Sequence, residues 1–379
     1  MQNVEINVEE DPLYQEFINK RKLNKSTIRV YNGRLNSFCK FNGLNPSDLI
    51  KEAKKESIEQ INELFNNYIE YLKHSGKSSN TIYNNIDTIK AFYNEYHIDI
   101  KHINEIIPPK EERNFVNKII TKNQIKEALK YSNLRDKAII LLHMSSGMEA
   151  TELRKLTYGD FVASVKDYVD LKPKDYLNIP KLREELIKEN EPIGTWKIKK
   201  TRTNKTYITF NSPESVKAIL HYLIDRERTN KPVKSLADPL FVNSQNKTMN
   251  VSAHGSIFKR VNERANFGHI TDKRRFFSST MLRKYFKNQL SESGFDDSTI
   301  NTFLGQKLIE NTTRFTDDEI RKLKSKYISA MDDVSLENPK TISLTTKEYN
   351  RLLEKIDNKD KELKEIKKHL NHLKDVLEL

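Results

Sequence analysis

Apolar residues recur at intervals of three and four through the first hundred residues, a spacing typical of amphipathic helices. One expected helix carries Ile28, Tyr31, Leu35 and Phe38 on a single face. Comparable apolar runs lie at 13–18, 61–72 and 82–93. The residues able to cap these helices are Asp11, Ser26 and either Ser79 or Asn80. The pattern therefore predicts an N-terminal domain of four short helices over residues 11–105.

A charged segment with two adjacent prolines follows this domain. Pro108 and Pro109 favour extended backbone, and the charged residues beside them keep the chain solvated. We therefore interpret 106–118 as a linker and 119–337 as a second domain.

Most of the second domain also has the pattern of helices. One helix is expected after Thr121, a buried one around 138–144, and another after Ser212, where a proline suits the first turn. The stretch 162–194 differs, because it is charged, irregular and contains three prolines. We interpret it as an insertion to which no role is assigned.

Strand signals are confined to one place in the second domain. Residues 196–200 and 206–210 alternate between apolar and polar side chains with a period of two, and 201–205 join them. This pattern predicts a β-hairpin with a strongly basic tip.

The last segment, 345–379, has a repeat of its own. Thr345 and Glu348 have the spacing of a capping box, and apolar residues then recur at alternating steps of three and four, with only Lys359 out of place. About four heptads of this kind favour a coiled-coil helix that associates with itself or a partner. The alternative is a single helix that packs against the second domain. The whole chain is thus predicted to be mainly α, with one small β-hairpin.

Charge indicates the class of partner. Lys and Arg number 66 against 53 Asp and Glu, which gives a net charge of +13 and favours a polyanion, either nucleic acid or a membrane surface. The chain has no apolar run long enough to span a membrane and begins with polar residues, so we expect a cytoplasmic protein. The single cysteine, Cys39, excludes an internal disulfide and a cysteine-based metal cluster, and no nucleotide-binding glycine motif occurs.

Candidate chemistry gathers near the end of the second domain. Arg283 lies in an expected helix, a turn is expected at Leu304-Gly305, and another helix is expected from about Asn311. If these two helices fold back on each other, Arg283, Gln306 and Phe315 share one neighbourhood.

The spacing of these residues resembles that of the tyrosine recombinases, the phage-type integrases. That family has a His-x-x-Arg motif, a Leu-Gly-His turn, and a nucleophilic tyrosine nine residues after that histidine. Here the corresponding positions hold Thr280-x-x-Arg283, Leu304-Gly305-Gln306 and Phe315. The family's first arginine box, Thr-Gly-Leu-Arg-x-x-Glu-Leu, is matched by Ser146, Gly147, Glu152 and Leu153, while its arginine position holds Glu149.

The resemblance implies a fold and an activity. The fold would be a helical core-binding (SAM-like) domain followed by an α-rich catalytic domain, which clamp double-stranded DNA and assemble as four protomers. The activity would be site-specific recombination through a 3′-phosphotyrosyl intermediate, without metal or nucleotide cofactor. The resemblance implies a gene of a virus, archaeal in type, or of another mobile element. The family's catalytic lysine corresponds best to Lys200, with Lys199 and Lys205 as alternatives. The residues expected to contact DNA are Lys199, Arg202, Lys205 and Lys284.

Several positions depart from the family's chemistry. Phe315 has no hydroxyl with which to attack, and Thr280 and Gln306 can donate hydrogen bonds but cannot transfer a proton at neutral pH. A cation about 4 Å from a phosphate gains roughly 4 kcal/mol at an effective dielectric constant of 20, and Glu149 in its place loses as much. Another tyrosine, Tyr327, is expected to pack or to face solvent.

Two hypotheses follow from these departures. The chain is a site-specific recombinase that does not cleave DNA in this exact sequence, or it is a non-enzymatic DNA-binding regulator or structural protein derived from a recombinase. An RNA-binding or purely structural coiled-coil protein would account for the charge and the tail, but not for the spacing of the motifs.

Overall fold

The computed structural model describes residues 6–100, 103, 119–189, 191–200, 205–271, 274–306 and 315–336. The chain forms two compact units, Met1–Asn117 and Lys118–Leu379. Three predictions fall outside the described residues: the linker at 106–118, the role of Arg202 and the coiled coil at 345–379. In the described part of the chain, no helix is long and apolar enough to cross a membrane.

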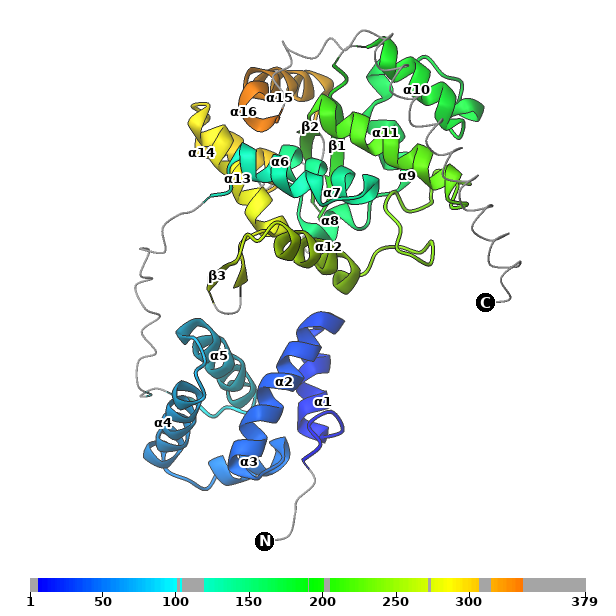
Figure 1. Cartoon of the computed structure of the whole chain (residues 1–379). Coiled ribbons are helices and arrows are strands. Elements are labelled where there is room, and N and C mark those ends of the chain that lie inside the picture. The colour runs from blue at the N-terminus through cyan, green and yellow to red at the C-terminus, as the bar shows by residue number, and fades with distance from the viewer. Residues whose placement is uncertain are drawn as a thin grey trace, which may run out of the picture. The chain divides into compact units, whose positions relative to one another are not determined.

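The first unit is a bundle of five helices (Figure 1). They are α1 (Pro12–Arg21), α2 (Lys25–Asn42), α3 (Pro46–Ala53), α4 (Ile58–His74) and α5 (Ser79–Glu95). The prediction of four helices was wrong by one, because α3 is short and begins with Pro46, which was interpreted as part of a turn. Proline suits this position, since the first turn of a helix needs no backbone donor.

The predicted caps of the first unit are partly confirmed. The Asp11 side chain accepts a hydrogen bond from the backbone N–H of Tyr14 at 3.1 Å. The predictions of Ser26 and of Ser79 or Asn80 were wrong, because Asn24 and Ser78 cap α2 and α5. In both cases a residue one or two positions earlier satisfies the first free N–H groups of the helix.

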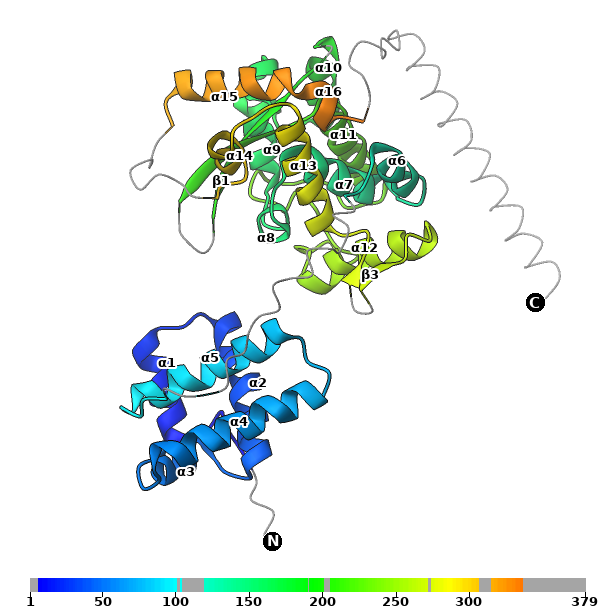
Figure 2. The ribbon, with the colours of Figure 1, turned by 90° about the vertical axis from the view of Figure 1, so that its left-hand side faces the viewer.

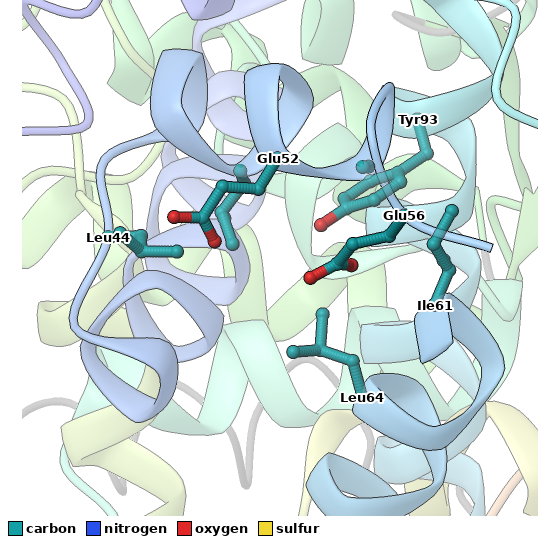
Figure 3. A pocket seen from close by; sticks show the side chains of 8 residues that line it. Leu44, Glu52, Glu56, Ile61, Leu64 and Tyr93 are labelled. Carbon is teal, nitrogen blue, oxygen red and sulfur yellow. The ribbon is translucent and has the colours of Figure 1, made fainter. Parts of the chain in front are cut away.

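The core of the first unit is aromatic, with Phe38, Phe65 and Tyr93 in mutual contact. A cavity of about 10 Å³ lies beside Tyr93 and is lined by Glu52 of α3, Glu56 between α3 and α4, and Leu64 of α4 (Figure 3). That volume holds about one water molecule, which is far too little for a ligand.

The second unit is organised around the buried helix α7 (Leu134–Ser146). Helices α11 (Pro213–Arg228) and α13 (Ser279–Glu292) lie alongside it (Figures 1 and 2). The predicted hairpin is confirmed as strands β1 (Gly194–Lys199) and β2 (Thr206–Asn211), which pair antiparallel with Trp196 opposite Thr209. Strand β2 contacts α7 through Thr209 on one face and α14 (Asp297–Phe303) through Phe210 on the other.

The other elements of this unit complete the shell around α7. They are α6 (Lys122–Lys130), α8 (Ala150–Leu153), α9 (Tyr158–Ser164), η1 (Lys166–Tyr168), η2 (Pro173–Asp175), α10 (Ile179–Lys188), α12 (Val251–Arg264), β3 (His269–Thr271), β4 (Arg274–Arg275), α15 (Asp317–Ser329) and α16 (Met331–Val334). The predicted helices after Thr121 and Ser212 are confirmed as α6 and α11.

Two expectations about this unit need correction. The stretch 162–194 is not irregular, because α10 forms within it and buries Ile179, Leu182 and Leu186 next to α11. The prolines misled the interpretation, although Pro180 lies in the first turn of α10, where it fits a helix. A second strand pair, β3–β4, was missed because its strands are only two and three residues long.

Candidate active site

The end of α7 is the point where the elements of the second unit meet. Gly147 ends the helix with φ +64°, a left-handed conformation that glycine adopts without steric cost. Four successive carbonyls here each accept a hydrogen bond from a side chain: Ser145 from Tyr327 at 2.8 Å, Ser146 from Thr209 at 2.7 Å, Gly147 from Arg283, and Met148 from His143 at 3.0 Å. These donors come from α15, β2, α13 and α7. We call this set of four carbonyls and their donors the α7 terminus.

Arg283 is oriented by backbone carbonyls on two sides. Its guanidinium donates to the carbonyl of Gly147 and, at 2.9 Å, to that of Leu304, which ends α14. The side chain is only 15 % exposed. Its planar fork is therefore fixed between α7 and the turn after α14, and the Nη2 that donates to Leu304 also lies 3.5 Å from Oε1 of Glu149.

Glu149 lies between two cations. Its Oε1 is 3.3 Å from Nζ of Lys200 and 3.5 Å from the guanidinium of Arg283. The Glu149 side chain is 44 % exposed, whereas that of Lys200 is 15 % exposed. The Glu149 carboxylate is thus more exposed to solvent than the two positive charges that it contacts. We call Lys200, Arg283 and Glu149 the charged cluster.

Lys200 reaches the cluster from the end of the hairpin. Its backbone N–H donates to the carbonyl of Lys205 at 2.9 Å, and its amine lies 5.6 Å from the centre of the Tyr207 ring. Lys199 is exposed, and Lys205 is half-buried. Of the three candidate lysines, Lys200 is the one that the structure brings beside Arg283.

Two buried residues below the cluster were not predicted as site residues. The hydroxyl of Tyr207 donates to Oε2 of Glu152 at 2.6 Å, and the same oxygen accepts the backbone N–H of Glu149 at 2.7 Å. Burial raises the pKa of Glu152 above its ordinary value, and burial with the neighbouring carboxylate raises the pKa of Tyr207 well above its own. Tyr207 therefore remains a protonated donor that holds Glu152, and Glu152 in turn holds the start of α8.

The Leu304-Gly305 turn closes on the hairpin, as the sequence predicted a turn there. Gly305 has φ +60°, and a Cβ at this position would lie 2.6 Å from the Tyr207 ring and 2.8 Å from Cε of Lys200. Only glycine allows this approach. Gln306, the next residue, is exposed beside the turn.

The remaining predicted site residues lie around this centre. Thr280 is exposed one helical turn before Arg283, and Lys284 is exposed next to Arg283 in the chain. Phe315 is half-buried and packs against an apolar cluster that includes Phe286 and Leu304. The described contacts therefore bring Glu149, Lys200 and Arg283 together, while Phe315 is held by apolar packing just before α15.

Tyr327 packs, as expected. It is fully buried, and its hydroxyl donates to the carbonyl of Ser145 at 2.8 Å. Burial raises its pKa well above the ordinary value for a tyrosine. A phenol in this position cannot reach a substrate or lose its proton.

Basic residues of the β3–β4 pair were also missed. His269 and Arg274 are exposed, and the pair precedes α13, which carries Arg283. The sequence signal was the basic run 273–275, but no strand pattern drew attention to it. Among the residues that the structure describes, no group of His, Cys, Asp and Glu side chains could hold a metal ion.

Comparison with known proteins gives the family. The sequence model of the phage integrase family matches residues 118–321, and that of the phage integrase SAM-like domain matches 12–105. A protein of Caldanaerobacter subterraneus subsp. tengcongensis, named as a tyrosine recombinase (TTE1313), is 27% identical over 307 residues, which cover 77% of this chain and 87% of that protein.

One solved structure shows the same fold, and a second is similar with a lower TM-score. The XerH site-specific recombinase bound to a palindromic difH substrate has a TM-score of 0.51 at 15% identity and covers 88% of both chains. The Tn1549 transposon integrase with circular intermediate DNA has a TM-score of 0.46 at 17% identity, with coverage of 82% of this chain and 97% of that one. Since the phage integrase match spans more than half of the chain, this protein belongs to the phage integrase family of tyrosine recombinases.

Proposed function

We propose that this chain is a site-specific DNA recombinase by family that binds double-stranded DNA at the charged cluster but does not cleave it in its present sequence. The observation that carries the proposal is the pair of covered cations, Lys200 and Arg283, with a carboxylate between them. Strand exchange by this family needs cations on the non-bridging oxygens of the phosphate, a nucleophile and an acid for the leaving group.

Arg283 and Lys200 are suited to the first and third of these tasks. A guanidinium can bind two phosphate oxygens at once, and Arg283 is already oriented by the carbonyls of Gly147 and Leu304. The Lys200 amine lies on the other side of Glu149, where it could protonate a leaving oxygen. Gln306 and Thr280, both exposed nearby, would add neutral hydrogen bonds to the same phosphate.

Two positions argue against cleavage. Phe315 offers no oxygen, and the nearby phenols of Tyr207 and Tyr327 are buried and engaged in hydrogen bonds. Glu149 replaces a cation by an anion, and a single arginine on a transferring phosphoryl group is worth roughly 10³–10⁵ in rate. Either change alone would be severe, and together they remove the usual route to a phosphotyrosyl bond.

DNA binding rests on charge as well as on family. The chain carries a net charge of +13, and Lys199, Lys284 and Arg274 are exposed on the elements that bear or precede the cluster. Lys205, at the start of the strand-β2 side of the hairpin, would extend this surface. Binding should therefore weaken steeply as salt rises. By family analogy we further propose four protomers on two duplexes, acting in the cytoplasm.

The test restores the two lost groups. We expect the Glu149→Arg, Phe315→Tyr double variant to form a covalent, detergent-resistant adduct with nicked duplexes prepared from DNA that flanks the gene, and each single variant to form much less. The matched control adds Arg283→Ala to the double variant and should abolish the adduct. DNA binding without any adduct from the double variant would reject the recombinase proposal.

The second candidate function is that of a DNA-binding regulator or structural protein. The ion pairs of Glu149 with both cations favour it, because the altered residue is integrated into the site. This candidate predicts that restoring Arg and Tyr yields no adduct, while the unchanged chain still binds DNA.

A further inference from the structure

Two buried histidines, one from α7 and one from α12, meet beside the site. His143 of α7 is 0% exposed and His254 of α12 is 4% exposed. Their Nε2 atoms are 2.9 Å apart, and the rings meet edge to face, at an interplanar angle of 73°. Phe258 packs against both rings, so that neither can turn freely.

The hydrogen bonds of the pair determine where its protons lie. The carbonyl of Met148 can only accept, so Nδ1 of His143 must carry a proton and donate to it. In a neutral His143 the other nitrogen, Nε2, then has a lone pair and accepts from Nε2–H of His254. The opposite arrangement requires a cationic His143 in a fully buried position.

The surroundings oppose that cation. Burial, followed by the neighbouring His254 and the charge of Arg283, lowers the pKa of His143 well below its ordinary value. Burial and Arg154 lower the pKa of His254 to about 4. Both rings are therefore neutral near pH 7, and the donor chain runs in one direction, from His254 through His143 to the Met148 carbonyl.

The peptide that receives this chain immediately precedes Glu149. Arg283 holds the carbonyl of Gly147, one peptide earlier. The carbonyls of Gly147 and Met148 are thus fixed by side chains from α13 and α7. Together these bonds set the position of the backbone at residue 149. This position is the one that faces both cations of the charged cluster.

Helix α12 connects this support to Arg283. Eight residues beyond His254, the side chain of Asn262 accepts the backbone N–H of Phe277 at 2.8 Å and donates to the carbonyl of Gly268 at 3.0 Å. Phe277 lies just before α13. Helix α12 therefore supports the segment before Glu149 through His254 and the segment before Arg283 through Asn262. These two residues are about 12 Å apart along the helix axis.

We propose that His143 and His254 are positioning residues of the site: their one-directional hydrogen-bond chain fixes the Met148 peptide and so sets residue 149 relative to Lys200 and Arg283. A packing role would need only the shapes of the rings. A positioning role needs the specified proton on each ring and the bond to Met148.

The first experiment examines the protons in the unmodified full-length chain. We expect nuclear magnetic resonance of ¹⁵N-histidine-labelled protein at neutral pH to show His143 protonated at Nδ1 and His254 at Nε2, with a coupling across the hydrogen bond between the two Nε2 atoms. His143 protonated at Nε2, or titrating like an exposed histidine, would overturn the proposal. This outcome does not depend on whether the protein binds or cleaves DNA.

The second experiment separates the two bonds of His143. An asparagine amide occupies the place of Nδ1 and can still donate to Met148, whereas a glutamine amide occupies the place of Nε2 and can reach only His254. We expect hydrogen exchange in 147–153 to be about tenfold faster in His143→Gln than in His143→Asn, because the former leaves a buried carbonyl unpaired.

Exchange in α11 reports the stability of the whole unit and should respond equally to both variants. His221→Asn on α11 is the matched control and should leave 147–153 unchanged. Equal exchange of 147–153 in the Asn and Gln variants would show that the ring only packs, and would refute the positioning role. If either variant fails to fold, the measurement on the unmodified chain still decides the question.

Discussion

Glu149→Gln removes one negative charge from the charged cluster and keeps the size of the side chain. At present a single carboxylate lies 3.3 Å from Lys200 and 3.5 Å from Arg283. A DNA phosphate that approaches these cations must compete with Glu149 and is also repelled by it. We therefore predict that the variant binds DNA more tightly than the unchanged chain.

The magnitude follows from the distances and the exposure. At about 6 Å, two like charges repel by roughly 0.7 kcal/mol in water and by roughly 2.8 kcal/mol at an effective dielectric constant of 20. The Glu149 side chain is 44 % exposed, which favours the lower part of this range. Freeing the two cations adds at most about 1 kcal/mol, because pairs open to solvent are worth little. A total of about 1–2 kcal/mol corresponds to roughly 5- to 30-fold in affinity.

The assay is fluorescence anisotropy with a labelled duplex over a series of salt concentrations. The plot of log affinity against log salt should become steeper by up to about 0.9, because one more phosphate contact releases counterions. Glu184→Gln on α10 is the matched control, since it makes the same charge change at an exposed residue outside the cluster.

An equal gain in Glu184→Gln would mean that net charge alone acts. Unchanged affinity in Glu149→Gln, with Glu184→Gln also unchanged, would mean that DNA does not use Lys200 and Arg283. Either result refutes the assignment of the cluster as the phosphate site.

Three further predictions concern stability. Gly305→Ala should lower the free energy of unfolding, measured by urea denaturation, by about 2 kcal/mol or more, because the residue has a positive φ and its Cβ would collide with Tyr207. An unchanged urea midpoint would contradict the close approach of Gly305 to Tyr207. Tyr327→Phe removes the hydrogen bond to Ser145 and should lower the free energy of unfolding by about 1 kcal/mol in the same assay. Added to the Glu149→Arg, Phe315→Tyr variant, it should leave adduct formation intact. Loss of the adduct without loss of stability would show that the hydroxyl takes part in the chemistry. Folding lowers the pKa of His254 from 6.5 to about 4, so the stability that neutral His254 contributes is complete above pH 6.5 and is lost as the pH falls toward 4. The free energy of unfolding should therefore drop by about 1–2 kcal/mol between pH 7.5 and pH 5. A His254→Phe variant with the same pH dependence would show that His254 is not the cause.

Local patterns in the sequence were sufficient for much of the fold. Alternation along 196–200 and 206–210 predicted the hairpin, and the caps at Asp11 and Thr121 are confirmed because they depend only on the next few residues. The errors occurred where a local rule has two interpretations. Proline marks both a loop and a first helical turn, so the helices that begin near Pro46 and Pro180 were missed.

The site was predictable only as a set of positions. Motif spacing selected Glu149 and Arg283, the place of the family's lysine in the hairpin favoured Lys200 over Lys199 and Lys205, and the structure brings Glu149, Lys200 and Arg283 together. Their partners could not be predicted, because the contact of Tyr207 with Gly305 and the bond of His143 to His254 depend on how distant elements pack. Such packing leaves no periodic signal in the chain. The roles of the site residues remain predictions for the experiments above.

The α7 terminus has a consequence for the order in which the protein can mature. Ser145 is made early in synthesis of the second unit, but Tyr327, which holds its carbonyl, is added 182 residues later. A ribosome-bound chain that lacks α15 would therefore have the α7 terminus without one of its four supports, two residues before the carbonyl that Arg283 holds. The charged cluster of an unfinished chain would be incompletely organised, so the DNA binding proposed above would begin only after the final helices have emerged.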